Sequence, residues 1–190
     1  MPSEILIRPA QPADYAEIAR ITQDAYLAAG YFTDPEFPYL QHIRKVDVRA
    51  REAEIWVAER DGSVIGSVTL AVQGEPWADI AREGELEFRL LVVDPGVQRS
   101  GAGRAMVQAI LDEARRRPGI SAVSLTTGES WESAHGLYRA FGFDRVPERD
   151  WWTPNGEVKL LVYRMDVTGQ AGSAADSAGQ ALQPGAAASL

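Results

Sequence analysis

The chain has 190 residues, a net charge of −8 and no cysteine. This length favours a single domain with its own hydrophobic core. The negative charge argues against binding to nucleic-acid phosphates, and the lack of cysteine excludes disulfides, thiolate metal sites and an acyl-cysteine intermediate. We see no signal-peptide pattern and no apolar run near the roughly 18 residues that span a membrane. We therefore expect a cytoplasmic protein that binds neither nucleic acid nor membranes.

The N-terminal part of the chain predicts a strand, two helices and a hairpin. Apolar residues recur at helical spacing in both predicted helices, and Asp61-Gly62 is a typical two-residue hairpin turn. In chain order, the predicted elements are a strand at 5–10, a helix at 12–30, a helix at 39–53 and a hairpin at 54–72. A loop at 74–84 follows.

The C-terminal part alternates strands and helices. The apolar end of the first strand is typical of a strand buried on both faces. Gly142 suits a left-handed helix cap, with Phe143 folded back onto the helix. The predicted elements are a strand at 85–93, a helix from the following glycine turn to about residue 117, a strand at 121–127, a helix at 130–141 and a strand at 157–167.

The last part of the chain differs in composition from the rest. Residues 168–190 are rich in Gly, Ala and Ser and nearly free of large apolar side chains. Such a segment buries too little surface to offset its ordering entropy. We therefore predict one domain over residues 1–167 and a disordered tail over 168–190.

The turn after the strand at 85–93 reads "QRSGAG", from Gln98 to Gly103. A nucleotide-triphosphate loop needs Lys and then Ser or Thr after its last glycine, and Arg104-Ala105 stands there instead. A dinucleotide fingerprint needs a third glycine, where this chain has Met106. Both of these phosphate-binding motifs are therefore poor matches.

The turn nevertheless has the chemistry of an anion site. The first N–H groups of a helix lack internal partners and carry the positive end of its dipole. Gly101 and Gly103 remove side chains that would keep a pyrophosphate away, while Arg99 and Arg104 add positive charge. A plain strand-to-helix turn is the structural alternative.

"QRSGAG" resembles the acyl-coenzyme A loop of the GNAT family of N-acetyltransferases. "EFRLLVVDP" before it and "SAHGLYRAFGFDRV" after it are similar to the family's fourth strand and last helix. The resemblance covers about residues 4–167 and is strongest over 87–146. It implies an α/β fold with a mixed, mostly antiparallel twisted sheet flanked by helices. Trp131 is a departure, because family members often carry Asn there to hold the coenzyme.

The resemblance implies acetyl-CoA as co-substrate and assigns it a site. Backbone groups of the strand end are expected to meet the pantetheine arm, where the fourth and fifth strands splay apart. The loop and the helix start are expected to hold the pyrophosphate. The predicted cofactor-binding residues are Leu91, Val92, Val93, Gln98, Arg99, Ser100, Gly101, Ala102, Gly103 and Arg104. No metal site is expected, since His42 and His135 are isolated.

Acetyl transfer to an amine needs a proton acceptor for the amine and a donor for the departing thiolate. By resemblance, Tyr138 is the candidate acid and Glu87 the candidate base, acting directly or through water. Glu85 competes for the role of base, because it lies on the same strand face. The structural alternatives are a core tyrosine and a solvated carboxylate.

We therefore expect an N-acetyltransferase that moves an acetyl group from acetyl-CoA to a primary amine by direct transfer in a ternary complex. Two alternatives are an acyl-CoA-binding sensor without catalysis and a nucleotide-dependent oxidoreductase. The acceptor can be a small molecule or a peptide, and a homodimer stays open. Loop aromatics that could form a pocket for an amine are Tyr31, Phe32, Trp77, Trp151 and Trp152.

Overall fold

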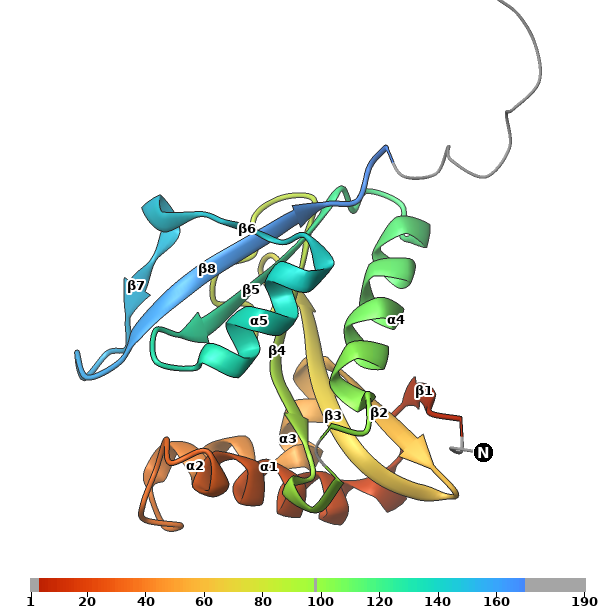
Figure 1. Cartoon of the computed structure of the whole chain (residues 1–190), viewed down its shortest axis with the longest axis vertical. Coiled ribbons are helices and arrows are strands. Elements are labelled where there is room, and N and C mark those ends of the chain that lie inside the picture. Colours follow the sequence, from red (N-terminus) through yellow and green to blue (C-terminus); the bar gives the residue numbers. More distant parts are fainter. Residues whose placement is uncertain (1–3, 98, 170–190) are drawn as a thin grey trace, which may run out of the picture.

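The computed structural model describes residues 4–97 and 99–169 and shows one sheet with helices on both faces (Figure 1). The strands are β1 (Leu6–Pro9), β2 (Glu54–Arg60), β3 (Ser63–Val72), β4 (Glu85–Val93), β5 (Ala122–Gly128), β6 (Asp144–Arg145), β7 (Trp151–Trp152) and β8 (Lys159–Asp166). The helices are α1 (Tyr15–Ala28), α2 (Pro38–Ile43), α3 (Val46–Glu52), α4 (Ala102–Arg116) and α5 (Glu132–Phe141), with short 3₁₀ turns at Pro12–Asp14, Pro95–Val97 and Pro147–Arg149.

The sheet has eight strands in the order β1-β2-β3-β4-β5-β8-β6, with β7 also paired to β8. Among the strands that the structure describes, β4 and β5 form the only parallel pair. The connection between them is the glycine turn and α4, as a parallel crossover requires. The predicted α/β fold with a mixed, mostly antiparallel sheet is confirmed.

Two layers of helices cover the sheet. Helices α4 and α5 pack on one face, over a core that includes Leu86 and Phe88 of β4. Helices α1 and α2 pack on the other face, against Ala71, Leu90 and Val92. The site residues of β4 therefore lie between the two helical layers.

The hairpin is confirmed: β2 and β3 are antiparallel, and Asp61 and Gly62 have φ angles of 52° and 77° in the turn. The single helix predicted at 39–53 is wrong, because two short helices stand there and Lys45 is non-helical. Leu40 and Arg49 are both buried. An unbroken helix advances about 100° per residue and would point these two side chains about 180° apart. Because the helix is interrupted at Lys45, the side chains of Leu40 and Arg49 can both point into the core.

The ordered strands end at Asp166, and Val167 is buried beside them. Residues 170–190 lie outside the described part of the chain, so disorder there stays a prediction, as does the domain boundary. Within the described residues, no helix combines the length and apolar character needed to cross a membrane.

Candidate active site

The second half of β4 contains a bulge. The pairing of β3 with β4 shifts between Ser67–Val92 and Thr69–Arg89, so Leu90 and Leu91 together face one residue of β3. Leu90 has a φ of 52°, which is unusual for a non-glycine residue. The extra residue reverses the alternation of side chains: Phe88 packs toward α4 and α5, whereas Leu90 packs toward α1 and α2. Bulges of this kind re-aim a strand beside functional sites.

Strands β4 and β5 separate at the same point. Their parallel pairing runs from Glu85–Ala122 to Phe88–Leu125 and no further, although β4 continues to Val93. Figure 1 shows the two strands diverging, with β4 running toward α1 and β5 toward the start of α5. The β4 backbone beyond Phe88 therefore has no ladder partner on the β5 side among the described residues. This is the separation of the fourth and fifth strands that the sequence resemblance implied.

The glycine turn leads directly into α4. Arg99 and Gly101 have φ angles of 64° and 87°, and Gly101 is the residue that caps the helix. The first intrahelical bond runs from the Ala105 N–H to the Gly101 carbonyl at 2.9 Å, so the N–H groups of Gly103 and Arg104 have no intrahelical partner. Gln98 lies outside the described residues, so its predicted role is untested.

Close packing holds the start of α4 against β4. A Cβ at Gly66 of β3 would lie 2.8 Å from the Val92 carbonyl and 3.1 Å from Met106 Cε, so only glycine fits. A Cβ at Gly103 would make ordinary contacts, the nearest 3.6 Å from Leu137. Arg104 lies over the Phe141 ring at 4.9 Å. The turn is thus fixed between β4 and α5 while its outer side stays open.

Tyr138 of α5 is buried and packs with Phe88, Phe143 and Tyr163, at ring distances of 5.8 to 6.0 Å. Its hydroxyl has no hydrogen-bond partner among the described residues. Burial raises the pKa of Tyr138, so the phenol stays protonated at neutral pH and can donate. Tyr138 and Glu87 are on opposite faces of β4, because Tyr138 packs on Phe88 and neighbouring strand residues alternate.

Glu87 is 0% exposed. Its Oε2 accepts hydrogen bonds from the N–H groups of Ile80 and Ala81, both at 2.9 Å, whereas Oε1 has no partner. Burial raises the pKa of Glu87, and the two backbone N–H groups offset this in part. A carboxylate with one free oxygen and a raised pKa is a suitable general base near neutral pH.

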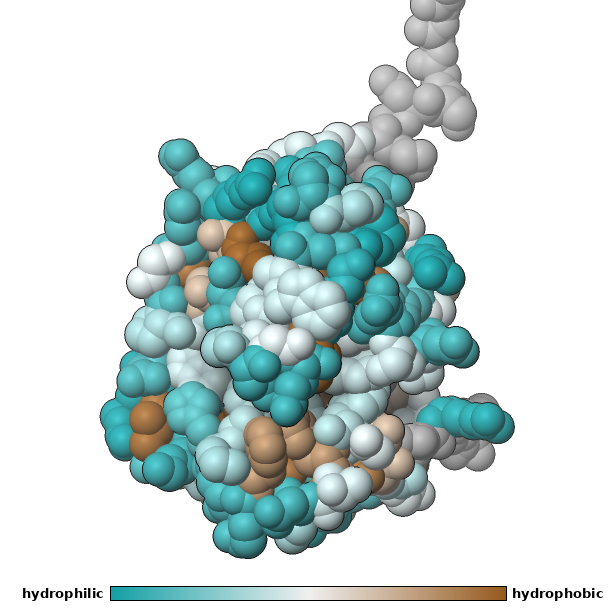
Figure 2. Space-filling model, turned by 90° about the vertical axis from the view of Figure 1, so that its left-hand side faces the viewer, coloured by the Kyte–Doolittle hydropathy of each residue, from teal (hydrophilic) through white to brown (hydrophobic). Residues whose placement is uncertain are grey.

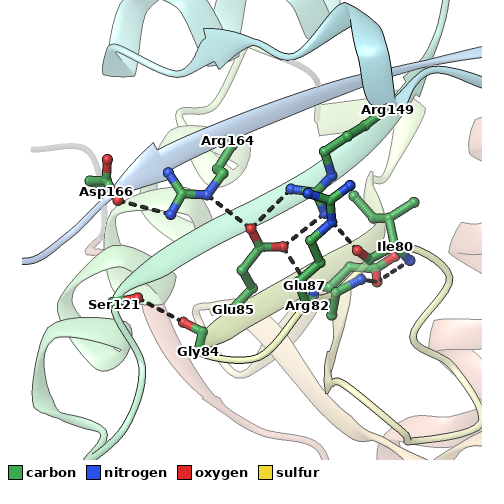
Figure 3. Close-up of polar contacts among 10 residues, drawn as sticks. Ile80, Arg82, Gly84, Glu85, Glu87, Ser121, Arg149, Arg164 and Asp166 are labelled. Atoms are coloured by element: carbon green, nitrogen blue, oxygen red, sulfur yellow. Dashed lines mark hydrogen bonds and ion pairs between the residues drawn. The ribbon is translucent and has the colours of Figure 1, made fainter.

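Glu85 is held in an ion-pair cluster (Figure 3). Arg149 donates to both of its oxygens at 2.9 Å, Arg164 donates to Oε1 at 2.9 Å, and the Arg82 N–H donates to Oε2 at 3.1 Å. Burial acts to raise the pKa of Glu85, but these bonds outweigh it and lower the pKa to about 2. Glu85 is therefore a poor base, and Glu87 is the stronger candidate.

The predicted loop aromatics divide into three groups. Tyr31 stacks on Trp131 at 4.0 Å, and Phe32 joins the same cluster through Tyr26. Trp77 is a buried anchor, stacked on His42, and is not an exposed pocket residue. Trp151 and Trp152 do not lie in a loop but form β7.

Trp131 takes the position where the family often has Asn. Its indole fills the space beside Gly128, where a Cβ would come within 2.5 Å of the ring. His135 is buried and its Nδ1 lies 2.7 Å from the Tyr163 hydroxyl, which supports the interpretation of a structural residue. Among the described residues, no cluster of three or more His, Cys, Asp or Glu side chains could hold a metal ion.

Sequence reasoning missed the arginines on the α1–α3 face. Arg89 of β4 is paired with Asp79 at 2.6 Å. Arg49 of α3 is fully buried beside Trp77. Arg49 reads as a surface charge in "RARE", and no local signal distinguishes it from its exposed neighbours.

The parallel strand pair β4–β5 separates beside a bulge and leads into a glycine-capped helix, which is the arrangement that the sequence resemblance implied for an acyl-coenzyme A site. The model of the Acetyltransferase (GNAT) family matches residues 15–143, which is more than half of the chain. The chain belongs to the GNAT acetyltransferase family, whose members use acetyl-CoA.

Individual curated relatives match over only part of their own length. Mycothiol acetyltransferase of Cellulomonas flavigena is 34% identical over 133 residues, which cover 65% of this chain and 38% of that protein. Human N-acetyltransferase 8 is 34% identical over 107 residues, covering 56% of this chain and 45% of that protein. The chain thus spans less than half of either relative. A Salmonella typhimurium structure with its cofactor acetyl-CoA has a TM-score of 0.64 at 21% identity, over 88% of this chain and 96% of that one.

Proposed function

We propose that this protein is an N-acetyltransferase that moves the acetyl group of acetyl-CoA to a primary amine, by direct transfer in a ternary complex. The observation that carries the proposal is the coincidence of the β4 bulge with the end of β4–β5 pairing, directly before the glycine-capped start of α4. Because the chain has no cysteine, an acyl-cysteine intermediate has no place in it. Cytoplasmic location and a homodimer stay predictions.

The predicted binding residues form two groups, one for the pyrophosphate of the coenzyme and one for its pantetheine arm. The N–H groups of Gly103 and Arg104, with the cations of Arg99 and Arg104, would hold the pyrophosphate at the positive end of the α4 dipole, beside Ala102 at the first position of the helix. Backbone groups of Leu91, Val92 and Val93 would hold the pantetheine arm along the open edge of β4. Ser100 supports the turn, because its Oγ accepts the Ala102 N–H at 3.4 Å.

Glu87 would act as the general base and Tyr138 as the general acid. The amine nitrogen forms a bond to the acetyl carbon as the carbon–sulfur bond breaks. The proton lost by the amine passes to Glu87, directly or through water, and the Tyr138 hydroxyl donates to the departing sulfur. Holding both reactants in line supplies much of the rate.

The site is tested by ligand stabilisation with a matched pair of variants. Acetyl-CoA binds only the folded state and should raise the melting temperature of the wild type. Gly103→Asp should abolish this shift, because its carboxylate would meet the pyrophosphate. Gly103→Ala should keep it, because a Cβ there makes ordinary contacts. If Gly103→Asp is stabilised as much as wild type, the turn is not the coenzyme site.

A further inference from the structure

Arg49 of α3 is a buried cation without a counter-ion. It is 0% exposed, and none of the ion pairs among the described residues includes it. Its Nη1 donates to Thr69 Oγ1 at 3.2 Å, while Nε and Nη2 have no hydrogen-bond partner. A buried charge is costly unless it is paired and hydrogen-bonded. The free protein therefore carries an unfavourable feature that a ligand could relieve.

The two atoms of Arg49 without a hydrogen-bond partner, Nε and Nη2, lie on the same side of the guanidinium group. Nε and Nη2 carry parallel N–H groups along one edge of the guanidinium plane. Two parallel N–H groups match the two oxygens of a carboxylate in a bidentate pair. Arg49 thus presents an intact binding edge for a carboxylate, with its third nitrogen fixed by Thr69.

Among the described residues, no carboxylate forms an ion pair or hydrogen bond with Arg49, although Glu52 accepts from the Nε1 of the neighbouring Trp77. Its guanidinium lies 5.8 Å from the Trp77 ring, and the nearby titratable groups are Tyr26, Tyr39 and Arg89. Burial lowers the pKa of Arg49 to about 10, so it remains charged at neutral pH. Arg89 differs, because Asp79 already neutralises it at 2.6 Å. Arg49 is the cation here that still needs a partner.

Arg49 is on the same side of the sheet as the proposed base. Thr69, its hydrogen-bond partner, is paired across the strands with Arg89, and Arg89 shares a strand face with Glu87. Two further buried atoms on this side lack partners: Ser67 Oγ and Glu87 Oε1. Unpartnered donors and acceptors thus gather on the sheet face that α1–α3 cover.

Aromatic rings lie between α1 and the start of α5. Tyr26 makes edge contacts with Tyr31 at 5.7 Å and with Trp131 at 6.3 Å. Tyr31 in turn stacks at 4.0 Å on Trp131, the residue directly before α5. Tyr31 and Phe32 are half-buried, and the face drawn in Figure 2 carries pale and brown residues among the hydrophilic ones. The Arg89 side chain is 17% exposed, so the cluster also reaches solvent there.

We propose that Arg49 binds a carboxylate of the acceptor, so that the substrate is a primary amine that carries a carboxylate on the same molecule. The inference rests on the proposed acetyl transfer to an amine and names the class of that amine. The carboxylate pairs with Nε and Nη2 of Arg49, and the amine reaches toward the free oxygen of Glu87. The aromatic residues on the sheet face that α1–α3 cover favour an acceptor with an apolar body.

Matched pairs of amines test the inference. L-phenylalanine is compared with 2-phenylethylamine, and 6-aminohexanoate with hexylamine. We expect kcat/KM about 10- to 100-fold higher for a carboxylate-bearing member, the range for hydrogen bonds to a charged group. If neither pair shows this preference while the neutral amines are acetylated, the proposed function stands and the role of Arg49 is wrong.

Variants at Arg49 separate recognition from structure. Arg49→Met keeps the length of the side chain and should remove the preference by raising KM for the acids, with neutral amines unaffected. Arg49→Lys should keep part of the preference for carboxylate-bearing amines, because lysine supplies a positive charge but cannot form a bidentate pair. Arg49→Met should melt at or above the wild-type temperature, since it removes an unpaired buried charge. A lower melting temperature with equal losses for acids and neutral amines would overturn the proposal.

A binding measurement makes the inference independent of turnover. 3-Phenylpropionate, which has no amine, should raise the melting temperature of the wild type. 3-Phenylpropanamide should not raise it, and 3-phenylpropionate should not raise the melting temperature of the Arg49→Met variant. If no amine is acetylated but 3-phenylpropionate still binds through Arg49, the proposed transfer fails and the carboxylate site stands. An equal shift from the acid and the amide would show that Arg49 does not select a carboxylate.

Discussion

Glu85 and Glu87 lie two residues apart on one face of β4, and their surroundings are opposite. Glu85 has both oxygens occupied by Arg149, Arg164 and the Arg82 N–H. Glu87 is equally buried but has no cation bonded to it, and its Oε1 is free. The difference separates two uses of a buried carboxylate. The paired one stabilises the fold, and the unpaired one costs stability and is available for chemistry.

The largest expected effect is on stability at Glu85. The pKa of Glu85 is lowered from 4.5 to about 2, which corresponds to about 3 kcal/mol of stability at neutral pH. Glu85→Gln should lower the free energy of unfolding by that amount at pH 7, measured in urea. Because the folded pKa is the lower one, the wild type keeps this stability above about pH 4.5 and loses it as the pH falls toward 2.

The exposed neighbour Glu83 supplies the control. Glu83→Gln should change the free energy of unfolding by less than about 0.5 kcal/mol, as surface substitutions usually do. If Glu85→Gln is no more harmful than Glu83→Gln, the cluster in Figure 3 does not stabilise the fold.

Tyr138→Phe extends the comparison to the other face of β4. The hydroxyl of Tyr138 has no partner among the described residues, so its removal should leave the melting temperature nearly unchanged. Turnover should fall about 100-fold, the usual loss for a general acid, while coenzyme affinity barely changes. Melting temperature, turnover and coenzyme affinity should be measured on the same preparation, so that a loss of activity can be separated from a loss of folded protein or of binding. Unchanged turnover would remove Tyr138 from the mechanism, although coenzyme binding would survive.

Glu87→Gln should have the smallest effect of the three, about 30-fold on turnover, because water can replace part of the base. Burial raises the pKa of Glu87 above its unfolded value. The charged carboxylate therefore costs stability at neutral pH, and Glu87→Gln should melt at or above the wild-type temperature.

The pH–rate profile of Glu87→Gln sharpens this prediction. The ratio of wild-type to variant activity should be largest between the pKa of Glu87 and that of the acceptor amine. It should shrink at lower pH, where Glu87 is protonated, and at higher pH, where the amine loses its own proton. A ratio that does not vary with pH would assign the role of base to water.

Local patterns predicted the strand, the glycine turn and the helix that carry the proposed coenzyme site, whereas long-range pairs determine the surroundings of the buried carboxylates. The glycine turn and the hairpin turn depend on adjacent residues, so both were predictable. The different surroundings of Glu85 and Glu87 were not predictable. The two arginines that pair with Glu85, Arg149 and Arg164, lie 64 and 79 residues from it in the sequence. The bulge at Leu90 is hidden in an apolar run. Arg49 is buried only because the helix predicted at 39–53 breaks in two.

The central claim is acetyl transfer to an amine, and the most direct measurement follows release of the coenzyme thiol from acetyl-CoA with a panel of amines. The acetylated product is identified by mass. We predict that thiol release depends on the amine, that one acetyl group is transferred per thiol, and that both are lost in Gly103→Asp and greatly reduced in Tyr138→Phe. Stabilisation by acetyl-CoA without thiol release for any amine would contradict the claim and leave an acyl-CoA-binding sensor.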